Sequence, residues 1–232
     1  MEFLDKRILG ICNELKRLSV VQKESLYHWL FKKGNYIHPC DAEAASEPYL
    51  PFDARSMQWF GPDAHYWFRT ECTVPNSMHG KPLWLNVRSQ IEEWDDAKNP
   101  QFLLFVNGEA VQGMDMNHRD VLLEKCAEGG KRYTLELQAY TGTLHSEFHL
   151  LSELREIDPE IEGLYYDLSV PLSAFPRLEE QARARMDLER VLNAAINLLD
   201  LRVPYSDAFF ASVQASRQYL AQALYTELAG HG

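Results

Sequence analysis

The spacing of the apolar residues divides the chain into a helical start, a central stretch of strands and a helical end. Near the N-terminus, apolar residues recur at steps of three and four, which places them on one helical face: Leu4, Ile8, Ile11, Leu15 and Leu18. A second short helix is expected up to residue 34, because Ser19 and Gln22 have capping-box spacing and Gly34 can end a helix. Its apolar face would hold Leu26, Trp29 and Leu30.

Residues 35–62 show no periodicity, and their prolines predict an irregular connection. A period of two then begins in residues 66–74, where one side carries Tyr66, Phe68, Cys72 and Val74 and the other carries Trp67, Arg69, Glu71 and Thr73. Further strands are expected at residues 83–88, 102–106, 110–112, 121–123, 132–140, 145–150 and 164–170. Short strands separated by Gly, Pro and Asn favour an antiparallel, jelly-roll-like β-sandwich.

The clearest turn signal is Asn107-Gly108, which ends an apolar run. Both residue types tolerate the positive φ angles of a type I′ turn. Because Val111 restarts the strand pattern soon afterwards, we expect a β-hairpin across this turn.

Beyond Pro176 the helical period returns. One apolar stripe predicts a long helix that ends before Pro204 and carries Leu188, Val191, Leu192, Ala195, Leu198 and Leu199. Ser206 can cap a following helix, whose apolar face would hold Phe210, Val213, Leu220, Leu224 and Leu228. The short link between the two predicts a helical hairpin.

The sequence therefore predicts a mixed, mainly β protein in three parts. Residues 1–49 would form a helical leader and an irregular connection, residues 50–175 the β-sandwich domain, and residues 176–232 the helical segment with the C-terminal hairpin. The N-terminal helices and the C-terminal hairpin would flank the sandwich.

Composition and charge restrict the partners. Hydrophobic residues make up 46% of the 232 residues, which is typical of a folded globular chain. The net charge of −11 repels phosphate backbones and anionic lipids, so neither nucleic acid nor membrane is an expected partner. We expect a cytoplasmic protein, because the N-terminus has no apolar signal region and no apolar run is long enough to cross a bilayer.

The cysteines support a reducing compartment. They lie far apart, without a C-x-x-C pair, at Cys12, Cys40, Cys72 and Cys126. Each is expected to be a small buried hydrophobic residue.

Charged clusters offer no convincing catalytic or metal site. Glycosidases use two carboxyl groups at a separation that only the fold can set. The acidic run is most simply a solvated loop and comprises Glu92, Glu93, Asp95 and Asp96. His118 and Asp120 could supply two zinc ligands, but a zinc site needs more, and a hydrogen-bonded polar turn is the favoured alternative. We assign no catalytic and no metal residue to the chain.

Aromatic residues are a second source of candidate sites. Core packing is expected for most of the tryptophans in or beside the sandwich, which are Trp59, Trp67, Trp84 and Trp94. Trp67 and Trp84 lie opposite the apolar series of their strands, so a second buried interface is favoured for them, with a binding surface as the alternative.

A dense polar group follows the predicted hairpin. It comprises Gln112, Asp115, Asn117, His118 and Arg119. Such groups are costly to bury without partners, so they should either bond one another or meet a neighbouring surface.

Several strings together give the chain a family resemblance. They are Tyr66-Trp-Phe-Arg69, Val106-Asn-Gly108, Gln112-Gly-x-Asp-x-Asn-His-Arg119, Asn197-Leu-Leu-Asp-Leu-Arg202 and Ser206-Asp-Ala-Phe209. With them the chain resembles the N-terminal region of glycoside hydrolase family 38 α-mannosidases, in their bacterial and cytosolic branch. The resemblance extends from the first helix to Tyr225.

The resemblance implies a β-sandwich that precedes a catalytic domain. In that family a zinc ion grips vicinal sugar hydroxyls and an aspartate attacks the anomeric carbon. The zinc-binding string His-x-Asp-x-Ala-Trp does not occur in this sequence. We therefore expect a non-catalytic, inactive N-terminal part of an α-mannosidase, without a cofactor of its own, whose zinc belongs to a catalytic domain further along the polypeptide.

The expected partners follow from the same resemblance. The catalytic domain of the same polypeptide comes first, and a second copy of the chain or a mannose-containing glycan are further partners. Two alternatives stay open. One is a carbohydrate-binding module in which Trp67, Trp84 or Trp94 stacks on mannose, and the other is a freestanding interaction domain.

Overall fold

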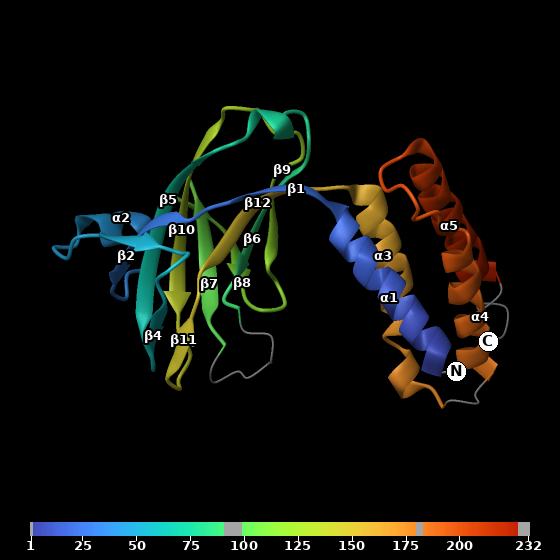
Figure 1. Cartoon of the computed structure of the whole chain (residues 1–232). Helices are drawn as coiled ribbons and strands as arrows, with labels where there is room; N and C mark the ends of the chain where they lie inside the picture. The colour runs from blue at the N-terminus through green and yellow to red at the C-terminus, as the bar shows by residue number, and fades with distance from the viewer. Residues whose placement is uncertain (1, 91–98, 180–182, 227–232) are drawn as a thin grey trace. The chain divides into compact units, whose positions relative to one another are not determined.

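The chain folds into two compact units (Figure 1). The computed structural model describes residues 2–90, 99–179 and 183–226. One unit, here called the sandwich unit, is residues 22–156, and the other, the helical unit, combines residues 1–21 with residues 157–232. The sandwich is thus inserted between two parts of the helical unit, a division that differs from the three consecutive parts expected from the sequence.

The sandwich unit contains two main sheets and one small one. The six-stranded sheet has the order β3 (Leu50–Asp53), β2 (His28–Lys33), β5 (His65–Thr73), β10 (Arg132–Tyr140), β7 (Gln101–Val106) and β8 (Glu109–Met114). The four-stranded sheet has the order β1 (Val20–Ser25), β12 (Leu151–Ile157), β6 (Leu83–Arg88) and β9 (Asp120–Glu124). β11 (Ser146–Phe148) pairs with β4 (Trp59–Gly61). Antiparallel pairing and a mainly β, mixed fold confirm the predicted fold class.

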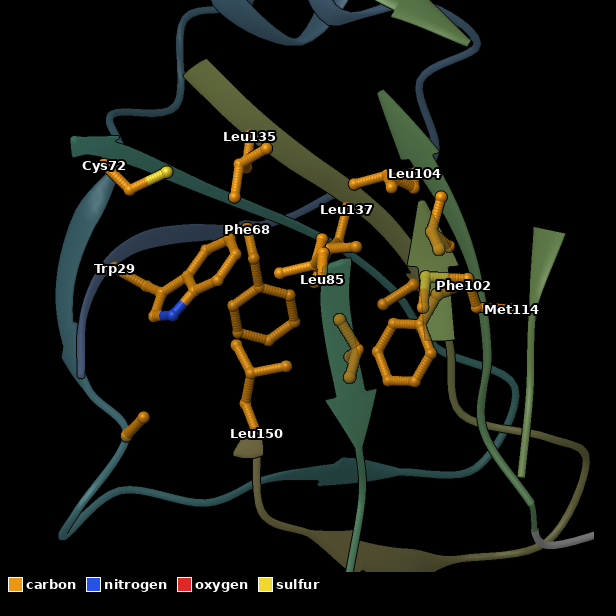
Figure 2. Packing of buried hydrophobic residues seen from close by; sticks show 14 of the residues in the cluster. Trp29, Phe68, Cys72, Leu85, Phe102, Leu104, Met114, Leu135, Leu137 and Leu150 are labelled. Atoms are coloured by element: carbon orange, nitrogen blue, oxygen red, sulfur yellow. The ribbon is translucent and has the colours of Figure 1, made fainter. Parts of the chain in front are cut away.

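Phe68 lies at the centre of the sandwich core. It is fully buried, and its ring meets the rings of Phe52 and Trp59 edge-on at centroid distances of 5.2 and 5.5 Å. Figure 2 shows it among side chains from several strands, with Trp29 and Leu85 beside it. The predicted alternation in β5 is confirmed, since Tyr66, Phe68 and Cys72 all belong to this core.

The predicted hairpin turn is also confirmed. Asn107 and Gly108 have φ angles of 53° and 86°, and β7 pairs with β8 across them. The Asn107 side chain adds a second function, because its Oδ1 accepts a hydrogen bond from the N–H of Thr134 on β10. The turn is therefore tied to the next strand of the sheet.

The predicted second helix over residues 19–34 is wrong, because these residues form β1 and β2. Ser19 Oγ donates back to the carbonyl of Lys16 at 2.8 Å, so it closes the first helix and caps no second one. In β2, Trp29 and Phe31 face the core while Leu30 lies outside, which is the period of a strand. Pairing with β5 and β3, both distant in sequence, overrides the local helical signal.

The predicted strand at residues 164–170 is wrong as well. These residues belong to α3 (Pro159–Leu172), which Asp158 caps by accepting from the N–H groups of Glu160 and Ile161. The buried residues Ile161, Leu164 and Leu168 follow helical spacing. The aromatic and β-branched residues between them produced the strand-like signal. The strand β12 was missed in the sequence.

The helical unit buries most of the apolar residues predicted for its helices, but Leu198 lies beyond the end of α4 and is 45% exposed. It comprises α1 (Glu2–Ser19), α3, α4 (Arg183–Asn197) and α5 (Asp207–Thr226). Ile8, Leu15 and Leu18 of α1 share a core with Val191 of α4 and Val213 of α5. Ser206 caps α5 as predicted, since its Oγ accepts from the N–H of Phe209. α4 and α5 pack on each other as the expected hairpin, while Leu228 lies outside the described residues.

The cysteines do not share one environment. Cys12 and Cys72 are buried, and burial raises the pKa of each thiol to about 11. Cys40 and Cys126 are exposed, so the expectation of four buried thiols is wrong for these two. Cys40 lies on the exposed side of α2, and Cys126 lies in the bend after β9.

We predict that Phe68→Ala destabilises the sandwich unit by about 3–5 kcal/mol, because it removes a fully buried aromatic side chain and leaves a cavity. Urea unfolding followed by tryptophan fluorescence measures this, since all five tryptophans lie within the sandwich unit. Phe60→Ala is the matched control, because that side chain is 52% exposed. Equal effects of the two substitutions would contradict the central position of Phe68.

Candidate functional site

The outer face of the six-stranded sheet, turned away from the core, carries buried polar residues. On it, Trp67 and Arg69 of β5 lie opposite Gln138 and Glu136 of β10 in the strand register. Residues 34–49, here called the cover segment, lie over this face and contain the short helix α2 (Pro39–Ala44). Ala42 of α2 packs on Trp67 and Phe105 to form a second, small buried cluster.

The cover segment is held mainly by polar contacts. Gln138 Nε2 donates to the carbonyl of Tyr36 at 2.6 Å, and Lys32 Nζ donates to the carbonyl of Glu47 at 3.0 Å. Arg69 forms an ion pair of 3.1 Å with Glu43. These contacts tie three neighbouring strands to one short stretch of chain, so the cover segment has a defined position on the sheet.

Trp67 is fully buried under this segment, with a relative exposure of 0%. Its ring centroid lies 5.4 Å from that of Phe105. Trp67 therefore packs within the sandwich unit, under a segment of the same unit. Among the described residues, its indole Nε1 has no hydrogen-bond partner, and neither has the buried hydroxyl of Tyr49.

Two open clefts meet at Arg69. One, of about 690 Å³, lies between α2, strand β10 and the Asn107-Gly108 turn, and Arg69, Thr134 and Glu136 line it. The other, of about 630 Å³, lies toward β2 and β3, and Tyr49 contributes to its lining together with Arg69. Both clefts lie on the outer face of the sheet.

Glu136 is the most unusual group in the larger cleft. Only 4% of it is exposed, and within the described part of the chain no hydrogen bond to its carboxylate is found. Burial raises the pKa of Glu136 above its ordinary value, the positive charge of Arg69 opposes the rise, and the negative charge of Glu43 adds to it. Burial likewise raises the pKa of Tyr49 to about 12, with a further contribution from the charge of Glu136.

The polar string after the hairpin forms an ordered loop at the end of β8. Asp115 Oδ1 accepts from the N–H groups of Asn117 and His118 at 2.7 and 2.8 Å, and it lies 3.1 Å from His118 Nδ1. Arg119 Nε donates to the carbonyl of Met116. Several of these polar residues thus bond one another, while Gln112 stays half-buried on β8 and the side chain of His118 remains 70% exposed.

The far end of this loop is attached to β6. Asn86 Nδ2 donates to the carbonyl of Arg119 and to Asp120 Oδ1, and Arg155 lies 3.4 Å from the same carboxylate oxygen. Asp120 therefore joins β9 to its neighbouring strands, and it does not form a metal site together with His118.

The other predicted tryptophans have different positions. Trp59 is buried in the main core, as expected. Trp84 is half-buried on the outer face of the four-stranded sheet, where it lies between Arg155 and Leu122 in the register. Trp94 and the acidic residues Glu92, Glu93, Asp95 and Asp96 lie outside the described residues.

The described residues contain neither a cluster of metal ligands nor a helix that could span a membrane. Across residues 2–90, 99–179 and 183–226, no three His, Cys, Asp or Glu side chains gather as metal ligands would. Over the same ranges, every helix is too short or too polar to traverse a bilayer.

Sequence reasoning did not single out Glu136 or Tyr49, and it named Arg69 only as an outward strand residue and as part of a family string. The outward residues of β10 are all polar, which is the pattern of a solvated face. The cover segment reverses that expectation for Glu136, because it buries the middle of the strand. Its prolines and lack of periodicity gave no indication of where it packs.

Comparisons with known proteins give a partial likeness only. No protein-family model matches the chain, and no curated protein matches it. Among solved structures, a β-glucuronidase from Ruminococcus gnavus bound to an N1-substituted uronic isofagomine is 12% identical, with a TM-score of 0.37, over 58% of this chain and 29% of that chain. The β-D-glucuronidase of Dictyoglomus thermophilum is 10% identical, with a TM-score of 0.37, over 59% and 28%.

This chain therefore spans less than a third of the length of those enzymes. A TM-score of 0.37 is too low to carry either their fold or their activity over to this chain.

We predict that Asp115→Ala loosens the loop at the end of β8 without unfolding the sandwich. Burial alone would raise the pKa of Asp115, but hydrogen bonds from His118 and Asn117 outweigh it and hold that pKa below its ordinary value. Without these bonds, the amide protons of Asn117 and His118 should exchange faster in NMR experiments. Glu109→Ala, at the other end of β8, is the control, and unchanged exchange in Asp115→Ala would contradict the prediction.

We also predict that Glu136 makes the sandwich unit less stable as pH rises. Its folded pKa is raised, so folding favours the protonated carboxyl, and this contribution is present below the unfolded pKa and lost as pH rises through the folded value. Glu136→Gln should therefore flatten the stability profile measured by urea unfolding above about pH 4.5. Glu147→Gln, an exposed change on β11, should leave the profile as it is. A profile unchanged in Glu136→Gln would contradict the burial of this charge.

Proposed function

We propose that the chain is the non-catalytic N-terminal part of a zinc-dependent retaining α-mannosidase, which hydrolyses terminal α-mannosides. In this proposal the sandwich and helical units position the catalytic domain of the same polypeptide and supply one wall of its substrate cleft. Zinc belongs to that catalytic domain. The observation that carries the proposal is the Gln112–Arg119 string, which holds the most specific part of the resemblance to family 38.

The structure of that string supports a docking role. The loop is exposed and ordered by its own hydrogen bonds, with Asp115 at their centre. The sandwich core does not require this arrangement, since of these residues only Met114 is fully buried. A loop whose geometry is fixed before docking loses little conformational entropy on binding, so it suits recognition of a neighbouring domain.

The helical unit offers a second surface for the same domain. From Ala208 to Leu224, the exposed positions of α5 carry only alanine and glutamine: Ala208, Ala211, Gln214, Ala215, Gln218, Ala221 and Gln222. Depletion of charged residues is a feature of the central part of protein interfaces. In the proposed enzyme this face of α5 packs against the catalytic domain.

We predict that the chain and the polypeptide encoded downstream of it associate when they are produced separately. Their mixture should cleave an aryl α-mannoside in the presence of zinc, whereas the 232-residue chain alone should not. Exchanging both Asn117 and His118 for alanine should weaken the association about tenfold, because exposed hot-spot residues carry much of a docking energy. Glu147→Ala on β11 is the matched control.

Two results would count against the proposal. Turnover by the chain alone would show that it contains catalytic machinery. A downstream coding sequence without His-x-Asp-x-Ala-Trp would remove the α-mannosidase from consideration.

A further inference from the structure

The larger cleft on the outer face of the six-stranded sheet contains a carboxyl group, that of Glu136, which the described part of the fold leaves without a hydrogen bond. Glu136 lines this cleft and is only 4% exposed. Its carboxylate accepts no hydrogen bond from the described residues. Buried polar groups are normally hydrogen-bonded, and those without partners often mark a place where a ligand or water belongs. Trp67 Nε1 and the Tyr49 hydroxyl, both on the same side of the sheet, are unpaired as well.

Arg69 places donors directly beside this acceptor. Arg69 and Glu136 are cross-strand partners on β5 and β10, and both line the cleft. The guanidinium uses one nitrogen on Glu43, at 3.1 Å, and has five N–H groups in all. The Glu136 carboxylate therefore offers a hydrogen-bond acceptor, and the Arg69 guanidinium offers donors beside it. The two groups are as far apart as directly opposite side chains on neighbouring strands.

The charge of the cleft favours a neutral ligand. Of the charged groups that line it, Arg69 pairs with Glu43, and Glu136 lies opposite Arg69 in the strand register. An anion would meet the Glu136 carboxylate, and a cation would meet Arg69. A hydroxyl group both donates and accepts, so two adjacent hydroxyls can satisfy a carboxylate and a guanidinium at the same time.

We propose that this cleft is a binding site for a neutral ligand with adjacent hydroxyl groups, a sugar or related polyol, held between Glu136 and Arg69. Thr134, on the same strand as Glu136, adds a hydroxyl to the lining. The cleft volume of about 690 Å³ is in the range of small-molecule sites. The site uses no exposed tryptophan, so it differs from the stacking surface considered for Trp67, Trp84 and Trp94.

This inference stands on the cleft alone and needs no catalytic domain. A chain that binds a polyol here could belong to a different enzyme, and an α-mannosidase could lack the site. The two proposals therefore fail separately.

The test is an NMR titration of the ¹⁵N-labelled 232-residue chain with D-mannose and with cis-1,2-cyclohexanediol. Both should shift the signals of the Arg69 Nε–H and the Thr134 backbone amide, because both residues line the cleft, while cyclohexanol, with one hydroxyl, should shift them far less. Glu136→Gln should weaken binding about tenfold, since it replaces a charged acceptor by a neutral one. Glu147→Gln on β11 should bind as the unmodified chain does.

Several results would overturn the proposal. One is the absence of any shift of either signal up to the solubility limit of mannose, and another is an equal shift with cyclohexanol. The others are equal binding by Glu136→Gln, and binding of the cation arginine amide in place of mannose and the cyclohexanediol. Should Glu136→Gln fail to fold, the ¹³C signal of the Glu136 carboxyl in the unmodified chain decides. It should move with mannose, and a static signal would end the proposal.

Discussion

Burial of strand β5 on both faces is the constraint on which the sandwich unit depends. On one face Phe68 is packed among core aromatics, and on the other Trp67 is packed under α2. A strand of a two-layered sandwich normally needs apolar residues on one side only. Because β5 needs both, the sheet is complete only when the cover segment lies over it, and residues 34–49 become a third layer over its middle.

This third layer brings polar groups out of solvent together with Trp67. Polar and charged residues surround Trp67 on the outward face of β5 and β10, so a segment that covers Trp67 also covers Glu136 beside Arg69. Glu43 of the cover segment pairs with the charge of Arg69, and the carboxylate of Glu136 remains without a hydrogen bond from the described part of the chain. The packing that stabilises the sheet thus also creates a cleft lined by charged groups that can bind a ligand, which a solvated sheet face would not have.

Sequence reasoning succeeded where a structure depends on residues close together in the chain, and it failed where the structure depends on residues far apart. α1, α4, α5 and the strands β6 and β10 were predicted because their periodicity is contained in one short stretch. The Asn107-Gly108 turn was predicted because its φ angles depend on two residues. β1 and β2 were mistaken for a helix, since their partners β12 and β5 are distant in sequence. The outward position of Trp67 could be read from alternation, but the burial of Glu136 required knowing where residues 34–49 pack.

The insertion of the sandwich into the helical unit sets an order of events on the ribosome. α1 precedes the sandwich in the chain, yet the helices that cover its apolar stripe, α3, α4 and α5, emerge only after the entire sandwich has been synthesised. Domains generally fold as units during translation, so the sandwich can mature while Ile8, Leu15 and Leu18 still lack their partners. The apolar stripe of α1 is therefore without its native partners from the time it is made until the sandwich is complete and the later helices emerge.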